Sequence, residues 1–263
     1  MMKDSNSLLD NLSIILVNYK TLELTRACLD LLREHLGGVQ VPVYVVDNHS
    51  ADASTDYLRT LDWIHLIERK SLSPETGSMA HGRALDCALQ AVATDYALLL
   101  HTDTLIHDPR ALHVLLEQGV GCPGIAAVGC LEQLDRGLAR SAWRLATRFV
   151  RHHVRRGLRA AGLNARTPRP YRERHLKSFC ALWNVRLIKQ HGLRFQLDSR
   201  NPGYELQDRL QQMGYGIGYV TPRSLFRYLD HLQSGTVAAN GGYRREHRRV
   251  RAYREFFQPL TPG

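Results

Sequence analysis

Tyr96-Ala-Leu-Leu-Leu-His-Thr-Asp-Thr104 is the stretch that decides how this chain folds. Its apolar residues predict a buried β-strand over 96–100, and the polar residues His101, Thr102 and Asp103 follow where that strand ends. In α/β folds, ligands bind outside the carboxyl ends of parallel strands. The carboxylate of Asp103 is therefore expected at the mouth of the sheet, which makes Asp103 the first candidate for a binding residue.

On either side of this strand the chain alternates between apolar runs and helical patterns. Short apolar runs predict further strands, and apolar residues three or four apart predict helices. The predicted strands cover 12–18, 41–47, 64–68, 96–100 and 125–130, and the predicted helices cover about 22–36, 54–61, 79–93 and 109–118. Such alternation is typical of βαβ units. The sequence therefore predicts an α/β fold with a central, mostly parallel sheet flanked by helices.

Length and composition fit one large α/β domain. The chain has 263 residues, of which 44% are hydrophobic, so it can bury a sizeable core. No apolar run reaches the ~18 residues that a membrane span needs, and the polar start of the chain lacks the apolar region of a signal peptide. The five cysteines show no CxxC spacing, which is typical of small buried residues in a reducing compartment. These features predict a cytoplasmic protein.

A basic segment interrupts the α/β pattern after residue 136. Between Arg140 and Lys177 there are twelve lysines and arginines and one acid, Glu173, in a chain whose formal charge is +10. Many of these arginines recur at intervals of three or four, which on a helix forms one basic stripe, and 242–257 is a second basic helix candidate. Such a block predicts an anionic partner: phospholipid head groups, a phosphorylated glycolipid or nucleic acid.

Three stretches of the chain form a pattern that few unrelated sequences would share. They are Leu12-Ser-Ile-Ile-Leu-Val-Asn-Tyr-Lys20, Val43-Tyr-Val-Val-Asp-Asn-His-Ser-Ala-Asp-Ala-Ser54 and His101-Thr-Asp103. This pattern resembles the family-2 glycosyltransferases of GT-A fold, of the bacterial surface-polysaccharide or lipopolysaccharide type. The resemblance covers 12–108 well and 179–236 more loosely. It implies a Rossmann-like nucleotide-sugar-binding fold and an inverting transfer of a sugar from a UDP-, dTDP- or GDP-linked donor to a hydroxyl of a glycan or lipid-linked acceptor.

The resemblance also implies which polar residues contact the donor. Asn18 and Asp47 are expected to line the nucleotide pocket, because a carboxylate at a strand end can accept a hydrogen bond from a base N–H or a ribose hydroxyl. His81 and Arg83 lie where a helix begins, and free N–H groups at such a place favour a diphosphate. The alternative for both is an exposed helix start, and the polar residues of 48–54 also fit turn and helix-cap positions.

The stretch His101-Thr-Asp103 departs from the family pattern, in which both ends are aspartate. Family members hold a divalent cation that offsets charge on the departing diphosphate. By resemblance Asp103 binds this cation, Mn²⁺ or Mg²⁺, while His101 and Thr102 contact the donor. His101 is also a candidate metal ligand together with His231, which precedes Gly235 and other small residues. The alternative for His101 is an ordinary residue at a strand end.

The transfer also needs a general base that takes the proton of the acceptor hydroxyl. The resemblance places this base in an acidic segment before a helix that ends in Gly-Tyr, and 201–215 matches that segment without its usual Glu-Asp pair. Glu205 is the first candidate, Asp208 lies one helical turn further on the same face, and Asp198 is an outside candidate. Trp183 is in a stretch that resembles a loop over the acceptor, where it would stack on a sugar ring; core packing is the alternative.

Together these expectations describe a single GT-A domain over 1–263. Its parts are a nucleotide-sugar-binding half at 11–135, a basic helical insertion at 136–177, and an acceptor-binding half with a basic C-terminal helix at 178–263. The leading prediction is an enzyme that 140–177 holds peripherally on the anionic inner face of the cell membrane. The alternatives are a catalytically inactive GT-A-like binding protein and a nucleic-acid-binding module. Nucleic acid is not expected, because aromatic residues are too sparse in the basic segment for base stacking.

Overall fold

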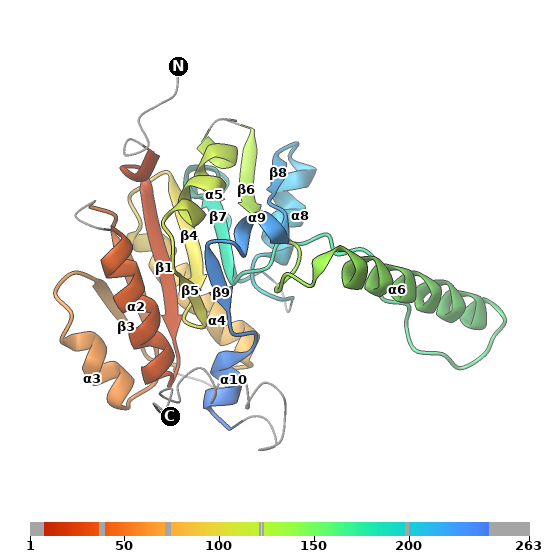
Figure 1. Cartoon of the computed structure of the whole chain (residues 1–263), viewed down its shortest axis with the longest axis horizontal. Helices are drawn as coiled ribbons and strands as arrows, with labels where there is room; N and C mark the ends of the chain where they lie inside the picture. Colours follow the sequence, from red (N-terminus) through yellow and green to blue (C-terminus); the bar gives the residue numbers. More distant parts are fainter. Residues whose placement is uncertain are drawn as a thin grey trace, which may run out of the picture.

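A computed structural model describes residues 8–36, 40–71, 75–120, 122, 124–197 and 200–241. These residues form an α/β fold in which helices flank a seven-stranded sheet, and a long helical arm extends to one side (Figure 1). The predicted fold class is confirmed. The helix candidate at 242–257 and the outside candidate Asp198 lie outside the described residues.

The large sheet has the order β3-β2-β1-β4-β7-β6-β8. Its strands are β1 (Leu12–Asn18), β2 (Val43–Asn48), β3 (His65–Arg69), β4 (Tyr96–His101), β6 (Ile125–Gly129), β7 (Cys180–Asn184) and β8 (Gly216–Tyr219). Strand β7 runs antiparallel to β4 and β6, and the other pairings are parallel. Residue 18 pairs with residue 47, and residue 17 with residue 101. The polar residues that end β1, β2 and β4 therefore meet at one edge of the sheet.

Helices cover both faces of this sheet because the strands present apolar side chains to each face in turn. In β1, Ile14 and Leu16 join one core cluster with residues of α2 and α5, whereas Ile15 joins another with residues of α4, α7 and α8. The helices outside the arm are α2 (Leu22–Leu36), α3 (Ala53–Arg59), α4 (Gly77–Ala91), α5 (Arg110–Val120), α7 (Val185–Gln190), α8 (Tyr204–Gln212), α9 (Pro222–Leu225) and α10 (Gly235–Ala239).

A two-stranded sheet joins the end of β4 to a distant part of the chain. Strand β5 (Thr104–Ile106) pairs antiparallel with β9 (Leu229–His231), and the register sets Thr104 opposite His231. The backbone N–H of Leu232 also donates to the carbonyl of Asp103 at 2.8 Å. His231 therefore lies beside Asp103, although the two are far apart in the sequence.

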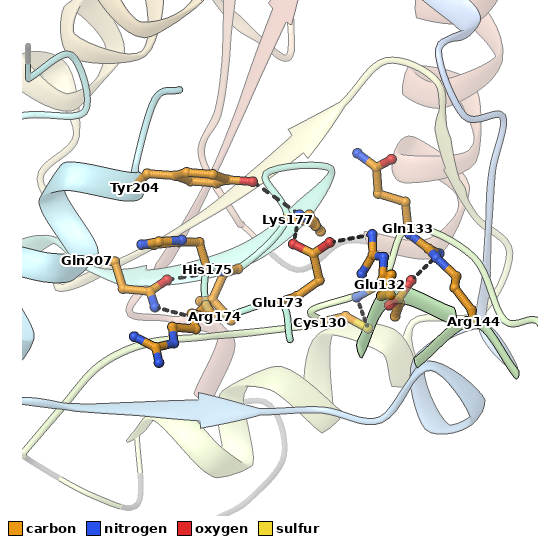
Figure 2. Close-up of polar contacts among 12 residues, drawn as sticks. Cys130, Glu132, Gln133, Arg144, Glu173, Arg174, His175, Lys177, Tyr204 and Gln207 are labelled. Carbon is orange, nitrogen blue, oxygen red and sulfur yellow. Dashed lines mark hydrogen bonds and ion pairs between the residues drawn. The ribbon is translucent and has the colours of Figure 1, made fainter. Parts of the chain in front are cut away.

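The arm is helix α6 (Gly137–Ala160), which the arginine spacing predicted, followed by a return segment over 161–176 (Figure 1). None of its 24 residues is buried. Glu132 holds its base by accepting hydrogen bonds from Arg136 and Arg144 at 3.1 and 2.8 Å (Figure 2). Glu173 forms an ion pair with Arg148 at 2.8 Å. Ion pairs of Glu132 thus tie the start of α6 to the body, and the ion pair of Arg148 ties α6 to the return segment.

The cysteines and the helices also bear on two expectations from the sequence, a reducing compartment and the lack of a membrane span. The five cysteines are free, and the prediction of small buried residues holds for Cys28, Cys130 and Cys180, whereas Cys87 is half-buried and Cys122 is exposed. Within the described ranges, no helix combines the length and apolar character that crossing a membrane requires.

Candidate functional site

The carboxyl ends of β1, β2 and β4 border a cavity of about 880 Å³, here called the strand-end cavity. Tyr19, Asn48 and Thr102, which lie where these strands end, all line it, and α4 and α10 add His81 and Thr236. Ligand sites in open α/β sheets are found at this edge, and their volumes are typically ~300–1,000 Å³. Position and size therefore both indicate a binding site.

Asp103 is a carboxylate on this cavity whose side chain is only 4% exposed. The backbone N–H of Gly235 donates to its Oδ2 at 2.8 Å. Its Oδ1 is buried, and no hydrogen bond from the described residues reaches it. A Cβ at Gly235 would lie 2.8 Å from the Cβ of Asp103, so the close approach of this N–H requires glycine. One carboxylate oxygen is thus held by the backbone while the other stays available to a ligand.

His231 lies next to the available oxygen, with its Nε2 atom 3.4 Å from Asp103 Oδ1. Its Nδ1 atom donates to the carbonyl of Gln133 at 3.0 Å, since a carbonyl can only accept. Its ring also stacks on Phe179, with centroids 4.5 Å apart. These contacts fix the orientation of the ring, so Nε2 faces Asp103. Metal-binding histidines use the same device.

Two further imidazoles complete this corner of the cavity. His101 Nδ1 lies 3.7 Å from Asp103 Oδ1, and the ring of His81 meets that of His101 edge-on at 5.3 Å. Burial lowers the pKa of His101, and burial together with His101 lowers the pKa of His81 to about 3. Both rings are therefore neutral near physiological pH. Their Nε2 atoms are buried, and no hydrogen bond within the described part of the chain satisfies them.

Asp103 remains ionised in this setting. Burial acts to raise its pKa, but the contact with His231 Nε2 and the hydrogen bond from the N–H of Gly235 hold that pKa below its ordinary value. The corner therefore combines one negative carboxylate with the neutral imidazoles of His81 and His101. This is the protonation state in which carboxylate and histidine side chains bind metal ions.

The residues His101, Asp103 and His231 fit a divalent metal ion. Each offers one ligand atom, and these atoms lie within 4.8 Å of one another. A cation among them would satisfy the unpartnered Oδ1 of Asp103. Two imidazoles and one carboxylate form a mixed nitrogen and oxygen set that suits Mn²⁺ and other first-row transition metals. The predicted metal residues are therefore brought together, including the pair that is distant in the sequence.

A second charged group lines the cavity near α4. Arg69 donates to Asn48 Oδ1 at 2.6 Å and to both carboxylate oxygens of Glu75 at 2.6 and 2.8 Å. Arg83 also donates to Glu75, at 2.5 Å, but it is exposed and is not among the described residues that line the cavity. A direct contact of Arg83 with a diphosphate stays a prediction, and in the structure Arg83 helps to neutralise Glu75.

Asn18 and Asp47 are buried, and neither is among the described residues on the cavity wall. Asn18 Nδ2 donates to Asp47 Oδ1 at 2.8 Å, Asn18 Oδ1 accepts from Thr25 at 2.8 Å, and Asp47 Oδ2 accepts from Thr55 at 3.0 Å. These bonds tie the ends of β1 and β2 to α2 and α3. The two residues thus position the neighbours that line the cavity, and their own contact with a nucleotide stays a prediction.

The two candidate bases lie together on α8 but not at the cavity. Arg200 donates to Glu205 at 2.8 Å and to Asp208 at 2.6 Å, which agrees with the prediction that both acids share a helix face. His175 Nε2 lies 2.8 Å from Asp208 Oδ1. Neither acid is among the described residues that line the strand-end cavity. Their role as the base stays a prediction.

Trp183 requires a correction. The stretch that resembled a loop over the acceptor is β7, a strand between β4 and β6, and the Trp183 side chain is in the core at 3% exposure. Its ring packs edge-on against Phe195 at 5.5 Å. Stacking on a sugar needs an exposed ring face, so the core-packing alternative describes Trp183 in this structure. All five residues of β7 (Cys180–Asn184) are buried, which is typical of a strand inside a sheet that is covered on both faces.

Several residues of the site were not identified from the sequence. In the sequence Gly235 stands out only as a small residue soon after His231, and that proximity is the available signal. Gln133 contributes its backbone carbonyl, which any residue carries, so no side-chain signal exists. Arg69 ends β3 and Glu75 precedes α4, and their pairing depends on how these two elements are placed in the fold.

Comparisons with known proteins identify the fold. No family model and no curated protein matches the chain. Among solved structures, it is similar to mannosyltransferase PcManGT from Pyrobaculum calidifontis in complex with GDP-Man and Mn²⁺, with a TM-score of 0.56 and 17% identity over 80% of this chain and 55% of that one. It is also similar to S. aureus TarS, residues 1–349, with a TM-score of 0.51 and 12% identity over 80% of this chain and 58% of that one.

A third similar structure is glucosyl-3-phosphoglycerate synthase from Mycobacterium tuberculosis in complex with UDP. The TM-score is 0.52 and the identity 18%, over 84% of this chain and 75% of that one. The chain spans little more than half the length of the first two proteins. At these identities the likeness establishes the fold: the chain has the GT-A fold of glycosyltransferases.

Proposed function

We propose that this chain is a metal-dependent glycosyltransferase that moves a sugar from a nucleoside-diphosphate sugar to an acceptor hydroxyl. The observation that carries the proposal is the group His101, Asp103 and His231, on a cavity of about 880 Å³ at the strand ends of a GT-A fold. Similar structures hold GDP-Man with Mn²⁺, or UDP, which supports a nucleotide-sugar donor.

The proposed roles follow from the contacts in the cavity. Asp103, His101 and His231 would hold the cation, whose charge would offset that of the departing diphosphate. The N–H of Gly235 orients Asp103 before a ligand binds, as the carbonyl of Gln133 orients His231. Preorganised ligands of this kind need little rearrangement on binding.

The remaining donor contacts are proposed on the same basis. His81 and Thr102 line the cavity, and His81 offers an unpartnered ring nitrogen to a sugar or phosphate oxygen. Asn18 and Asp47 would reach a nucleotide base only if their mutual hydrogen bond were exchanged for bonds to the ligand.

We further propose that the transfer inverts the anomeric centre. The acceptor hydroxyl would attack from the face opposite the diphosphate while a carboxylate takes its proton. Glu205 and Asp208 are the candidates for this carboxylate, and the ion pairs of both with Arg200 would have to open first.

The proposed setting is the synthesis of surface polysaccharide or lipopolysaccharide at the cytoplasmic face of the cell membrane. The exposed arginines of α6 support contact with an anionic membrane surface, because they project from the body along an arm (Figure 1). Binding to vesicles that contain phosphatidylglycerol is expected, and salt is expected to weaken it.

The test is a donor panel. The full chain is incubated with Mn²⁺ and each of a set of UDP-, dTDP- and GDP-linked sugars, and release of the nucleoside diphosphate is measured. We expect slow hydrolysis of one donor, loss of that activity on chelation and its return with added Mn²⁺. Asp103→Asn should lower the rate by about 10²–10³-fold, as loss of a key electrostatic group does. Asp108→Asn, which removes a carboxylate paired with Arg110 outside the cavity, is the matched control.

Two results would contradict the proposal. Full metal-dependent activity in Asp103→Asn would remove Asp103 from the metal site. Absence of both turnover and thermal stabilisation with every donor would favour the alternative of a catalytically inactive GT-A-like binding protein.

A further inference from the structure

A second cavity, of about 940 Å³, lies where the arm leaves the body. It is bounded by the first turns of α6, by the segment 171–173 and by the chain around the start of α9; we call it the arm-base cavity. Its apolar wall consists of Leu131, Leu138, Leu145, Tyr171, Val220 and Pro222. A pocket of this size with an apolar wall can enclose much of a small amphiphilic molecule.

Arginines surround this apolar wall, and they differ in how they are neutralised. Arg144 and Arg148 line the cavity but are paired with the carboxylates of Glu132 and Glu173, at 2.8 Å in each case. Figure 2 shows the Glu132–Arg144 contact at the foot of the arm.

The other two arginines on the cavity are Arg172 and Arg223, and both are exposed. Arg172 lies over the ring of Tyr171, with 5.7 Å from its guanidinium carbon to the ring centroid. No ion pair joins either arginine to an acid in the described part of the chain. The remaining acid on the wall is Asp135, which accepts a hydrogen bond from the N–H of Gly137 at 2.9 Å. The cavity thus keeps a positive surplus at its rim, which favours an anionic head group.

One short segment separates this cavity from the strand-end cavity. Glu132 and Asp135 line the arm-base cavity, whereas Gln133 lines the strand-end cavity and holds His231. Figure 2 shows Glu132 and Gln133 next to each other, with Glu132 turned towards Arg144. A ligand in the arm-base cavity would therefore lie against the back of the segment that positions the metal site.

The apolar wall continues outward along the arm. Leu138 is 82% exposed and Leu145 43% exposed at the cavity, and Phe149 follows on the same side of α6 at 45% exposure. The helix also carries arginines throughout its length. Exposed apolar side chains among basic residues are typical of helices that lie in the interface of an anionic membrane. An amphiphile anchored in such a membrane could enter the cavity along this face.

We propose that the arm-base cavity binds a membrane-anchored amphiphile with a phosphate head group and a hydrocarbon chain. The rim arginines Arg172 and Arg223 bind the phosphate, and the apolar wall holds the first part of the chain. This binding does not depend on the proposed glycosyl transfer.

Binding of decyl phosphate to the full chain, measured by calorimetry, tests the proposal. Inorganic phosphate and decyl glucoside are the two comparison ligands, because one lacks the chain and the other lacks the charge. We expect decyl phosphate to bind at least about tenfold more tightly than either, since both the ionic and the apolar contact are then made. Decyl phosphate carried in phosphatidylcholine vesicles should likewise recruit the protein, and free phosphate should not release it.

Matched variants locate the binding. Arg172→Gln with Arg223→Gln should weaken decyl phosphate binding by about tenfold or more, whereas Arg155→Gln with Arg156→Gln, on the arm away from the cavity, should not. Leu145→Ser on the apolar wall is compared with Val150→Ser further along α6. All these residues are partly or fully exposed, so the variants are expected to fold, and their thermal midpoints verify it.

Several outcomes would overturn the proposal. Equal binding of inorganic phosphate would indicate a simple anion site, and equal binding of decyl glucoside would indicate an apolar cavity without head-group recognition. Equal losses in the two arginine pairs would place the binding on the arm as a whole. Failure of the proposed function is distinguishable, because then Mn²⁺ and nucleotide sugars would not bind to the wild-type chain while decyl phosphate still did.

Discussion

Asp103 and Trp143 belong to regions of this molecule that are built in opposite ways. The Asp103 side chain is 4% exposed and is contacted by β9 and by the chain at the start of α10. Trp143 is 74% exposed on a helix in which no residue is buried. In the first region long-range packing sets the geometry, so substitutions there should cost stability and binding together. In the second region local helix formation suffices, so substitutions should affect surface binding alone.

The two tryptophans give the largest expected difference between these regions. Trp183→Ala should lower the free energy of unfolding by about 3–5 kcal/mol, because it empties a large volume in the core. Trp143→Ala should change it by less than about 0.5 kcal/mol, while weakening binding to phosphatidylglycerol-containing vesicles. Urea unfolding and vesicle sedimentation measure the two quantities. Equal destabilisation by both variants would mean that the arm packs on the body.

Two glycine-to-alanine substitutions, one in each region, test the same comparison with a single added methyl group. Gly235→Ala places a Cβ 2.8 Å from that of Asp103, so it should destabilise the fold by about 1–3 kcal/mol and weaken Mn²⁺ binding. Gly157→Ala meets open space in the exposed helix α6 and should stabilise by about 0.5–1 kcal/mol. Thermal unfolding and Mn²⁺ titration provide the readouts. Unchanged Mn²⁺ affinity in Gly235→Ala would show that the N–H of Gly235 is not needed to orient Asp103.

A substitution at the junction between the two regions should change stability less than those in the core. Glu132→Gln removes the charge that Arg136 and Arg144 share, at a cost of about 0.2–1 kcal/mol because all three side chains are partly exposed. Limited proteolysis should cut the arm faster in this variant, and high salt should reduce the difference from wild type. Glu117→Gln, in the body helix α5, serves as the control. A proteolysis rate equal to that of wild type would mean that Glu132 does not hold the arm.

Substitution of the candidate base Glu205 is expected to have the smallest effect, and the quantity measured is kcat. Glu205 is paired with Arg200 and Arg209, and the pKa of its carboxyl lies below the ordinary value chiefly through hydrogen bonds from these two arginines. Asp208 is the second candidate and shares Arg200 with Glu205, so Glu205→Gln alone is expected to lower kcat less than tenfold, whereas loss of the sole general base costs about 10²–10⁴-fold. A loss in that larger range would establish Glu205 as the base and would require the ion pair with Arg200 to open during turnover.

Local patterns determined much of the fold and part of the candidate site. The predicted strand 12–18 and helix 22–36 match β1 and α2, and the helix of the basic segment is α6. Asp103 was found because an apolar strand followed by a carboxylate places that carboxylate at the edge of the sheet, whatever the rest of the chain does. The alternation of strands and helices likewise limited the topology to a mostly parallel sheet.

The tertiary structure alone decided how the site residues face one another. His231 meets Asp103 because β9 pairs with β5 in one register, and a register is a property of two distant segments together. Asp47 turns inward to Asn18, Trp183 packs in a central strand, and Glu205 is paired with Arg200, although each was expected to contact a substrate. Local sequence is enough to predict which side chains end the strands and where a helix forms, because those depend on neighbours along the chain. It left open which of those side chains reach the cavity, because that depends on contacts between segments that only folding brings together.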